Sequence, residues 1–155
     1  MGIICQCGVT ATSSASPVSY LINRIEHSGT LTVNLSVCPR CLQKNEFVNV
    51  SYVDNVDPDF NFTFSSQSIN LPLCEFFGEG NFASIFTTVG GTAVGKIING
   101  AATVTLTAQS DPDVVSFPTN QFFIGLDLED DNGNIFRQNS PIQLDSGEFD
   151  FCAPI

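Results

Sequence analysis

The sequence predicts an all-β protein, an antiparallel jelly roll or β-sandwich of about eight strands. Three observations predict it. Apolar and polar residues alternate with a period of two in many segments, turn-forming residues separate these segments, and helical periodicity is almost absent. With 155 residues the chain has the size of one domain, and its 14 Phe and no Trp predict a core of phenylalanine and aliphatic side chains.

The alternation locates the expected strands along the chain. In 30–38 the odd-numbered residues from Leu31 to Val37 are apolar, and polar residues lie between them. Because successive side chains of a strand point to opposite faces, such a segment turns one face to a core. The other segments with this pattern are 59–65, 101–109, 122–128 and 148–152, with inner faces formed by Phe60, Phe62 and Phe64, by Val104 and Leu106, by Phe122, Ile124, Leu126 and Leu128, and by Phe149 and Phe151.

Residues that favour turns separate these segments. They include Asp57-Pro58-Asp59, Gly90-Gly91, Asn99-Gly100, Asp111-Pro112-Asp113, Asn132-Gly133 and Ser146-Gly147. Because an Asn-Gly pair between two alternating runs is a strong hairpin signal, we expect a hairpin over 127–136. Its acidic residues do not follow the spacing of a calcium-binding loop, so we expect a solvated tip there.

The first seventeen residues differ from the rest. Thr10–Ser16 contains only Thr, Ala and Ser, and Pro17 follows. Such a small, polar and uncharged stretch buries little apolar surface. We therefore expect a flexible N-terminal arm over 1–17 and the folded domain over 18–155.

The charge of the chain excludes several classes of partner. The net charge is −11, with 16 acidic against 5 basic residues. An acidic surface repels the phosphate backbone of nucleic acids and the anionic headgroups of membranes. No apolar run reaches the roughly 20 residues of a membrane-spanning helix, so we expect neither nucleic-acid binding nor membrane insertion.

The six cysteines are the main candidates for covalent bonds or metal binding in the chain. Cys38 and Cys152 lie out of phase with their apolar neighbours, which predicts outward side chains or strand ends, and Cys5 and Cys7 lie on the arm. Three interpretations stay open: disulfides within the chain or free thiols, disulfides between chains, and a zinc site. The candidates for disulfides between chains are Cys5, Cys7, Cys38, Cys41, Cys74 and Cys152. The zinc site would use Cys5, Cys7, Cys38 and Cys41, but Cys-x-Cys is a poor zinc-binding pair, so we expect no metal and no other cofactor.

Catalytic motifs are missing from the sequence. His27 is the only histidine, and no Gly-x-Ser-x-Gly nucleophile motif is present. Next to Glu26 and Ser28-Gly29, His27 is expected to be a solvated turn residue. We therefore expect a structural protein and not an enzyme.

The layout of Ile3-Ile4-Cys5-Gln6-Cys7, a spacer up to Pro17 and a last strand that ends in Cys152 resembles the bacterial endospore appendage subunits, the Ena family. The resemblance implies a jelly-roll domain whose arm docks on a neighbouring subunit in a fibre. It implies that Cys5 and Cys7 bond to cysteines of the neighbour, including Cys152, and that Ile3 and Ile4 contribute to docking.

The expected function is therefore that of a subunit that assembles with copies of itself into a fibre on the spore surface. Met1-Gly2-Ile3-Ile4 lacks the charged and apolar regions of a secretory signal. Synthesis in the sporulating mother cell, which the resemblance implies, would need no such signal. The alternatives are a jelly-roll module that binds carbohydrate or a receptor, with a site around Phe76-Phe77 or 127–134, and a protein of the spore coat or exosporium layers.

Overall fold

The computed structural model describes residues 8–37, 46–70, 73–77, 82–111, 121–139, 142–144 and 148–150. These ranges contain eleven strands, all in antiparallel pairs, and one short 3-10 helix. The strands are β1 (Gly8–Ile22), β2 (Ile25–Val37), β3 (Phe47–Asp54), β4 (Phe62–Ile69), β5 (Leu73–Phe77), β6 (Phe82–Gly95), β7 (Gly100–Asp111), β8 (Gln121–Asp130), β9 (Ile135–Gln138), β10 (Ile142–Leu144) and β11 (Glu148–Asp150), and the helix is η3 (Pro58–Phe60).

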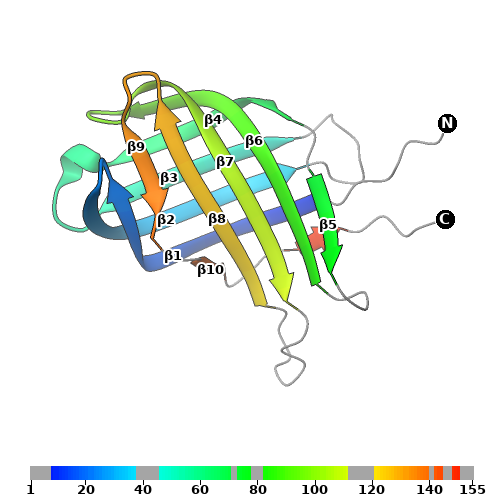
Figure 1. Ribbon diagram of the computed structural model, residues 1–155. Coiled ribbons are helices and arrows are strands. Elements are labelled where there is room, and N and C mark those ends of the chain that lie inside the picture. Colours follow the sequence, from blue (N-terminus) through cyan, green and yellow to red (C-terminus); the bar gives the residue numbers. More distant parts are fainter. Residues whose placement is uncertain are drawn as a thin grey trace.

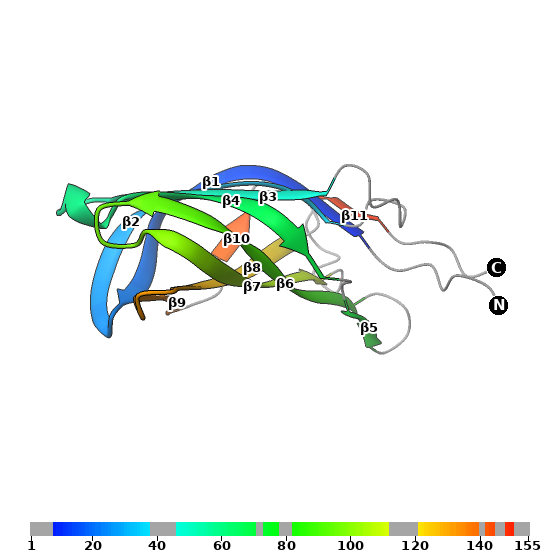
Figure 2. The same cartoon turned by 90° about the horizontal axis from the view of Figure 1, so that it is seen from above.

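Eight of these strands close into a barrel. The hydrogen-bonded order is β1, β2, β3, β4, β6, β7, β8 and β9, and β9 pairs again with β1 (Figure 1). The barrel is flattened, so that β1 to β4 lie in one layer and β6 to β9 in the other (Figure 2). The prediction of an antiparallel all-β fold is therefore confirmed, and the described strands pair mainly with their neighbours in the chain.

Strand β1 corrects the predicted extent of the N-terminal arm. Residues 8–17 are not a flexible spacer but the first part of β1, which pairs with β2 from Val9 opposite Val37 to Ile22 opposite Ile25. Cross-strand hydrogen bonds explain why a run of small polar residues forms a strand. The Thr12 hydroxyl donates to Asn34 Oδ1 at 3.1 Å, and the oxygens of Ser14 and Thr32 are 2.8 Å apart. Residues 1–7 of the predicted arm lie outside the described residues.

The inner faces follow the predicted alternation. Leu31, Val33, Leu35 and Val37 are buried, as are the described members of the other predicted faces. Phe60 is the exception, because it belongs to η3 and is half-buried. Close to β9, four rings form an aromatic cluster in which Phe136 stacks on Tyr20 with 3.8 Å between centroids. The cluster consists of Tyr20, Tyr52, Phe62 and Phe136.

Glycine at position 29 makes room for this cluster. A Cβ atom there would lie 2.7 Å from the ring of Tyr52 and 2.4 Å from the carbonyl oxygen of Val53. The ring of Tyr52 therefore covers the backbone of β2 at close range. Any larger residue at this position has to displace β3.

Strand β9 closes the barrel by pairing with both β1 and β8, whereas β10 pairs only with β8 and β11 only with β1. The partner pairs of β1 with β9 and with β11, such as Ile22 with Phe136 and Gly8 with Asp150, follow the same register at the two ends of β1. Strands β9 and β11 thus lie along the same side of β1. Where β9 leaves β8, the side chain of Gln138 replaces a peptide group: its Oε1 accepts the Leu126 N–H at 3.0 Å and its Nε2 donates to the Ile124 carbonyl at 3.1 Å.

The barrel has two unlike ends. At one, which we call the hairpin end, short connections join β1 to β2, β3 to β4, β6 to β7 and β8 to β9. At the other, which we call the terminal end, β1 begins at Gly8, β2 ends at Val37 and β11 ends at Asp150 (right in Figure 2). The two ends carry different candidate sites.

Candidate functional site

Only one of the predicted site residues belongs to the described part of the chain. Cys74 is on β5, where its backbone pairs with Ile85 of β6. The other predicted residues lie outside the described residues: Ile3, Ile4, Cys5, Cys7, Cys38, Cys41 and Cys152. The structure therefore places the strands that lead to them and not the thiols themselves.

Three of the strand ends that lead to cysteines lie side by side. Gly8, which follows Cys7 in the chain, pairs with Asp150, two residues before Cys152. Val9 pairs with Val37, which directly precedes Cys38. The ends of β11, β1 and β2 are consecutive in the sheet, so the chain continues toward three cysteines from one corner of the barrel.

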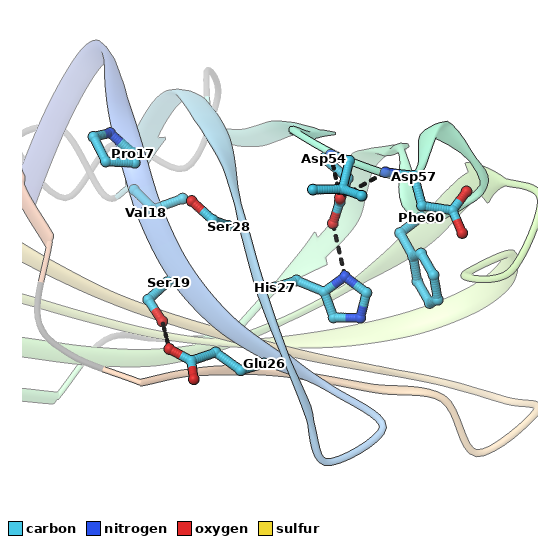
Figure 3. A pocket seen from close by; sticks show the side chains of 10 residues that line it. Pro17, Val18, Ser19, Glu26, His27, Ser28, Asp54, Asp57 and Phe60 are labelled. Carbon is cyan, nitrogen blue, oxygen red and sulfur yellow. Dashed lines mark hydrogen bonds and ion pairs between the residues drawn. The ribbon is translucent and has the colours of Figure 1, made fainter.

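A groove of about 670 Å³ lies at the hairpin end (Figure 3). It runs between β1, β2 and the segment that connects β3 to β4. The residues that line it include carboxylates, hydroxyls and apolar side chains, and no lysine or arginine. They are Pro17, Val18, Ser19, Glu26, His27, Ser28, Asp54, Val56, Asp57 and Phe60.

Asp54 is the centre of a hydrogen-bond network in this groove. Its carboxylate accepts hydrogen bonds from His27 Nδ1 at 2.9 Å, from the Tyr52 hydroxyl at 3.0 Å, and from the backbone N–H groups of Val56 and Asp57 at 3.0 Å each. Burial alone would raise the pKa of Asp54, but these hydrogen bonds outweigh burial and hold the pKa below its ordinary value. The carboxylate is thus ionised at neutral pH, and His27 donates to it through Nδ1–H. Burial, followed by the bond to Asp54, raises the pKa of Tyr52.

His27 is a strand residue and not the solvated turn residue that the sequence predicted. It is on β2, its side chain is 12% exposed, and its ring lies 4.3 Å from the ring of Phe60. Its Nε2 atom is buried and has no hydrogen-bond partner among the described residues. A hydrolytic triad would need a nucleophile hydroxyl or thiol on that nitrogen. The bond to Asp54 holds the His27 ring in place, and the same carboxylate fixes the segment after β3 through the N–H groups of Val56 and Asp57.

A second buried carboxylate, Asp130, was missed by the sequence analysis, which expected a solvated hairpin tip. Asp130 is 4% exposed at the end of β8. It accepts the backbone N–H groups of Asn132, Asn134 and Asn99 at 2.9, 2.8 and 3.2 Å, and the Asn134 side chain at 2.8 Å. Asn134 in turn contacts Asn23 and the Ile97 carbonyl. Three hairpin connections are thereby tied together.

Neither a metal site nor a membrane helix is found in the part of the chain that the structure describes. Its His, Cys, Asp and Glu side chains form no group of three or more that could hold a metal ion. No helix within it has the length and apolar character needed to cross a membrane.

Comparison with known proteins gives no relative: no family model, no curated sequence and no solved structure matches this chain.

Proposed function

We propose that this chain is a structural subunit that assembles with copies of itself into a fibre through disulfides at the terminal end. The observation that carries the proposal is the adjacency of β11, β1 and β2, whose ends lead to Cys152, Cys7 and Cys38. Joints at these positions leave the hydrogen-bonded barrel intact. Oxidising conditions are required for such bonds to persist.

The closed barrel favours cysteine joints over pairing between sheet edges. A barrel removes the free edges through which open sheets associate. The eight barrel strands each have two neighbours, at least over part of their length. A joint between copies therefore relies on covalent bonds or on outer faces. If Cys5 and Cys7 of one copy bond to Cys152 or another of the cysteines in the next, the contact is heterologous, and a heterologous contact that does not close produces a filament.

The more detailed expectations from the sequence and from the Ena resemblance are part of this proposal. They are docking of Ile3 and Ile4 on the neighbour, a location on the spore surface, and the jelly-roll connectivity of the appendage family. A jelly roll contains strands that pair across long stretches of chain, whereas the described barrel strands pair in chain order except at the seam. The proposal consequently rests on the adjacency of the strand ends that lead to the cysteines and not on jelly-roll topology.

Electrophoresis of the full chain with and without reductant tests the proposal. We expect a ladder of covalent multimers that collapses to the monomer when reductant is added, and filaments in electron micrographs of the oxidised material. The double variant Cys5→Ser/Cys7→Ser should stay monomeric, while Cys74→Ser, which changes a cysteine outside the β11–β1–β2 corner, should still form multimers. A single monomer band from oxidised wild-type protein would refute the proposal.

The groove at the hairpin end favours a second candidate function, a module that binds carbohydrate. Phe60 supplies an apolar ring, and Glu26 and Asp57 supply acceptors for hydroxyl groups. A protein that stays monomeric when oxidised and binds immobilised glycans would support this candidate over the fibre subunit.

A further inference from the structure

The groove at the hairpin end presents more hydrogen-bond acceptors than donors. Its polar side chains are three carboxylates, two hydroxyls and the His27 ring. The Ser19 hydroxyl already donates to Glu26 Oε1 at 3.3 Å, and Nδ1–H of His27 donates to Asp54. The Ser28 hydroxyl is the remaining side-chain donor. The groove therefore suits a molecule that brings donors of its own.

One of these acceptors is buried and has no donor. Because Nδ1 of His27 donates its hydrogen to Asp54, the lone pair of the neutral ring is on Nε2. Nε2 is buried, and no described residue donates to it. Native structures contain few buried acceptors without a partner, because each one loses its hydrogen bonds to water. The ring, held by Asp54 in the wall of the groove, is thus an acceptor that a donor from outside the chain can satisfy (Figure 3).

The negative charge of the groove has no cation of the chain beside it. The side chain of Asp54 is 1% exposed and ionised, and its four hydrogen-bond partners are uncharged. Glu26 and Asp57 add two carboxylates to the lining. None of the three described lysine and arginine residues lines the groove, and Lys96 pairs with Asp59 at 3.2 Å. Since a cleft lined by one sign of charge focuses its field, the groove attracts cations.

An aromatic ring and apolar side chains complete the lining. Phe60 of η3 is half-buried, and its ring lies 4.3 Å from that of His27. The face of an aromatic ring attracts a cation through its quadrupole. Pro17, Val18 and Val56 supply apolar surface for the rest of a ligand. These features distinguish the groove from a row of solvated acidic residues.

From these observations we infer that the groove binds a small ligand that carries an ammonium group. The ammonium group donates to the less enclosed carboxylates, Glu26 and Asp57, and lies against the ring of Phe60. A further N–H or O–H group of the ligand reaches Nε2 of His27 once the Phe60 ring turns from the imidazole toward the ligand. The inference goes beyond both functions proposed above, because it specifies the charge of the ligand. An amino sugar and an apolar amine share this chemistry.

Titration of the full chain with three matched ligands tests the inference. His27 is the only histidine, so its ring protons give NMR signals that report on the groove without ambiguity. Glucosamine and glucose differ in the ammonium group, and cyclohexylamine has the ammonium group without the hydroxyls. At constant pH 7, in reductant and at low salt, we expect glucosamine or cyclohexylamine to bind with a dissociation constant on the order of 1 mM, and glucose at least ~10-fold more weakly.

The three ligands separate this inference from the carbohydrate candidate, and reductant separates it from the disulfide joint. If glucose binds as tightly as the amines, the inference is overturned and the carbohydrate candidate stands. If neither amine shifts the His27 signals at concentrations up to about 50 mM, the inference is overturned as well. Binding of an amine supports the inference, and the tighter of the two identifies the ligand as an amino sugar or an apolar amine.

A matched pair of variants separates the groove from the general attraction of a chain with a net charge of −11 for cations. Glu26→Gln removes one carboxylate of the lining, and Glu129→Gln removes the same charge from the exposed surface of β8. Both side chains are exposed, so we expect both variants to fold. Glu26→Gln should weaken binding of the tighter amine at least ~3-fold, and Glu129→Gln should change it less than ~1.5-fold. Equal losses in the two variants would mean that the amine does not bind in the groove, which overturns the inference.

Discussion

The hairpin end and the terminal end of the barrel differ in what holds them together. At the hairpin end, two buried carboxylates each accept four hydrogen bonds, Asp54 from the segment after β3 and its neighbours, and Asp130 from the connections around β8. Three short strands lie outside the hairpin end, and each has a single described partner strand: β5 pairs only with β6, β10 only with β8 and β11 only with β1.

The two ends of the barrel therefore differ in role: the hairpin end stabilises the fold, and the proposed assembly uses the terminal end. Backbone groups at the ends of strands need partners, and a buried carboxylate satisfies several of them at once. The hairpin end therefore contributes to the stability of the barrel without any cysteine. Covalent bonds at the terminal end, which the proposed function requires, would leave both carboxylate networks of the hairpin end unchanged.

The largest loss of stability is expected when Asp130 is replaced. Replacing Asp130 with Ala leaves the N–H groups of Asn99, Asn132 and Asn134 without their acceptor. Because an unsatisfied donor costs about 1–3 kcal/mol, we expect the free energy of unfolding to fall by about 3–5 kcal/mol in urea denaturation.

Asp131 is the matched control for this variant. It is the next residue, its side chain is exposed, and its backbone N–H bond to the Ala101 carbonyl survives substitution. Asp131→Ala should change stability by no more than about 0.5 kcal/mol. Equal losses of stability in the two variants would mean that the buried Asp130 carboxylate does not stabilise the hairpin end.

A smaller loss of stability, which depends on pH, is expected when Asp54 is replaced. Asp54→Asn keeps the size of the side chain but removes the charge that accepts from His27 and Tyr52, so we expect a loss of about 1–3 kcal/mol at pH 7. The pKa of Asp54 is lowered in the folded state, so its contribution is present above the ordinary value of 3.8 and is lost as the pH falls through the folded pKa.

The stability difference between wild type and Asp54→Asn should thus shrink as the pH falls below about 4. Urea denaturation at pH 7, 4 and 2.5 measures it. A difference that stays constant over this range would mean that ionisation of Asp54 does not stabilise the hairpin end.

Much of the fold follows from the sequence because alternation reports which side chains face a core. The residues predicted for the inner faces of β2, β7 and β8 are buried wherever their side chains are described, but the prediction did not include the buried Ala102, Ala108 and Asp130. The closure into a barrel was not predicted, since it depends on which strand meets β1, and no local pattern encodes that pairing. Strand β1 itself was misjudged, because its first residues are stabilised by partners on β2 more than by their own composition.

The alternation pattern contains a signal for the two buried carboxylates. Asp54 is in phase with Val48, Val50 and Tyr52, and Asp130 is in phase with Ile124, Leu126 and Leu128. An acidic residue in phase with the core at the last position of a strand predicts a buried acceptor for the turn that follows. The partner of Asp54, His27, is 27 residues away and could be identified only from the barrel.

The smallest effect is expected from removal of residues 1–7. Strand β1 begins at Gly8, and the described partners of its backbone lie on β2, on β9 and Asn139 directly after it, and on β11. Deletion of 1–7 should therefore change the free energy of unfolding in reductant by no more than about 0.5 kcal/mol while it abolishes the covalent multimers.

Deletion of 1–16 is the contrasting variant. It removes half of β1, opens the barrel between β2 and β11, and should prevent folding, as circular dichroism would detect. If both truncated proteins fold equally well, β1 does not hold the barrel closed at the terminal end.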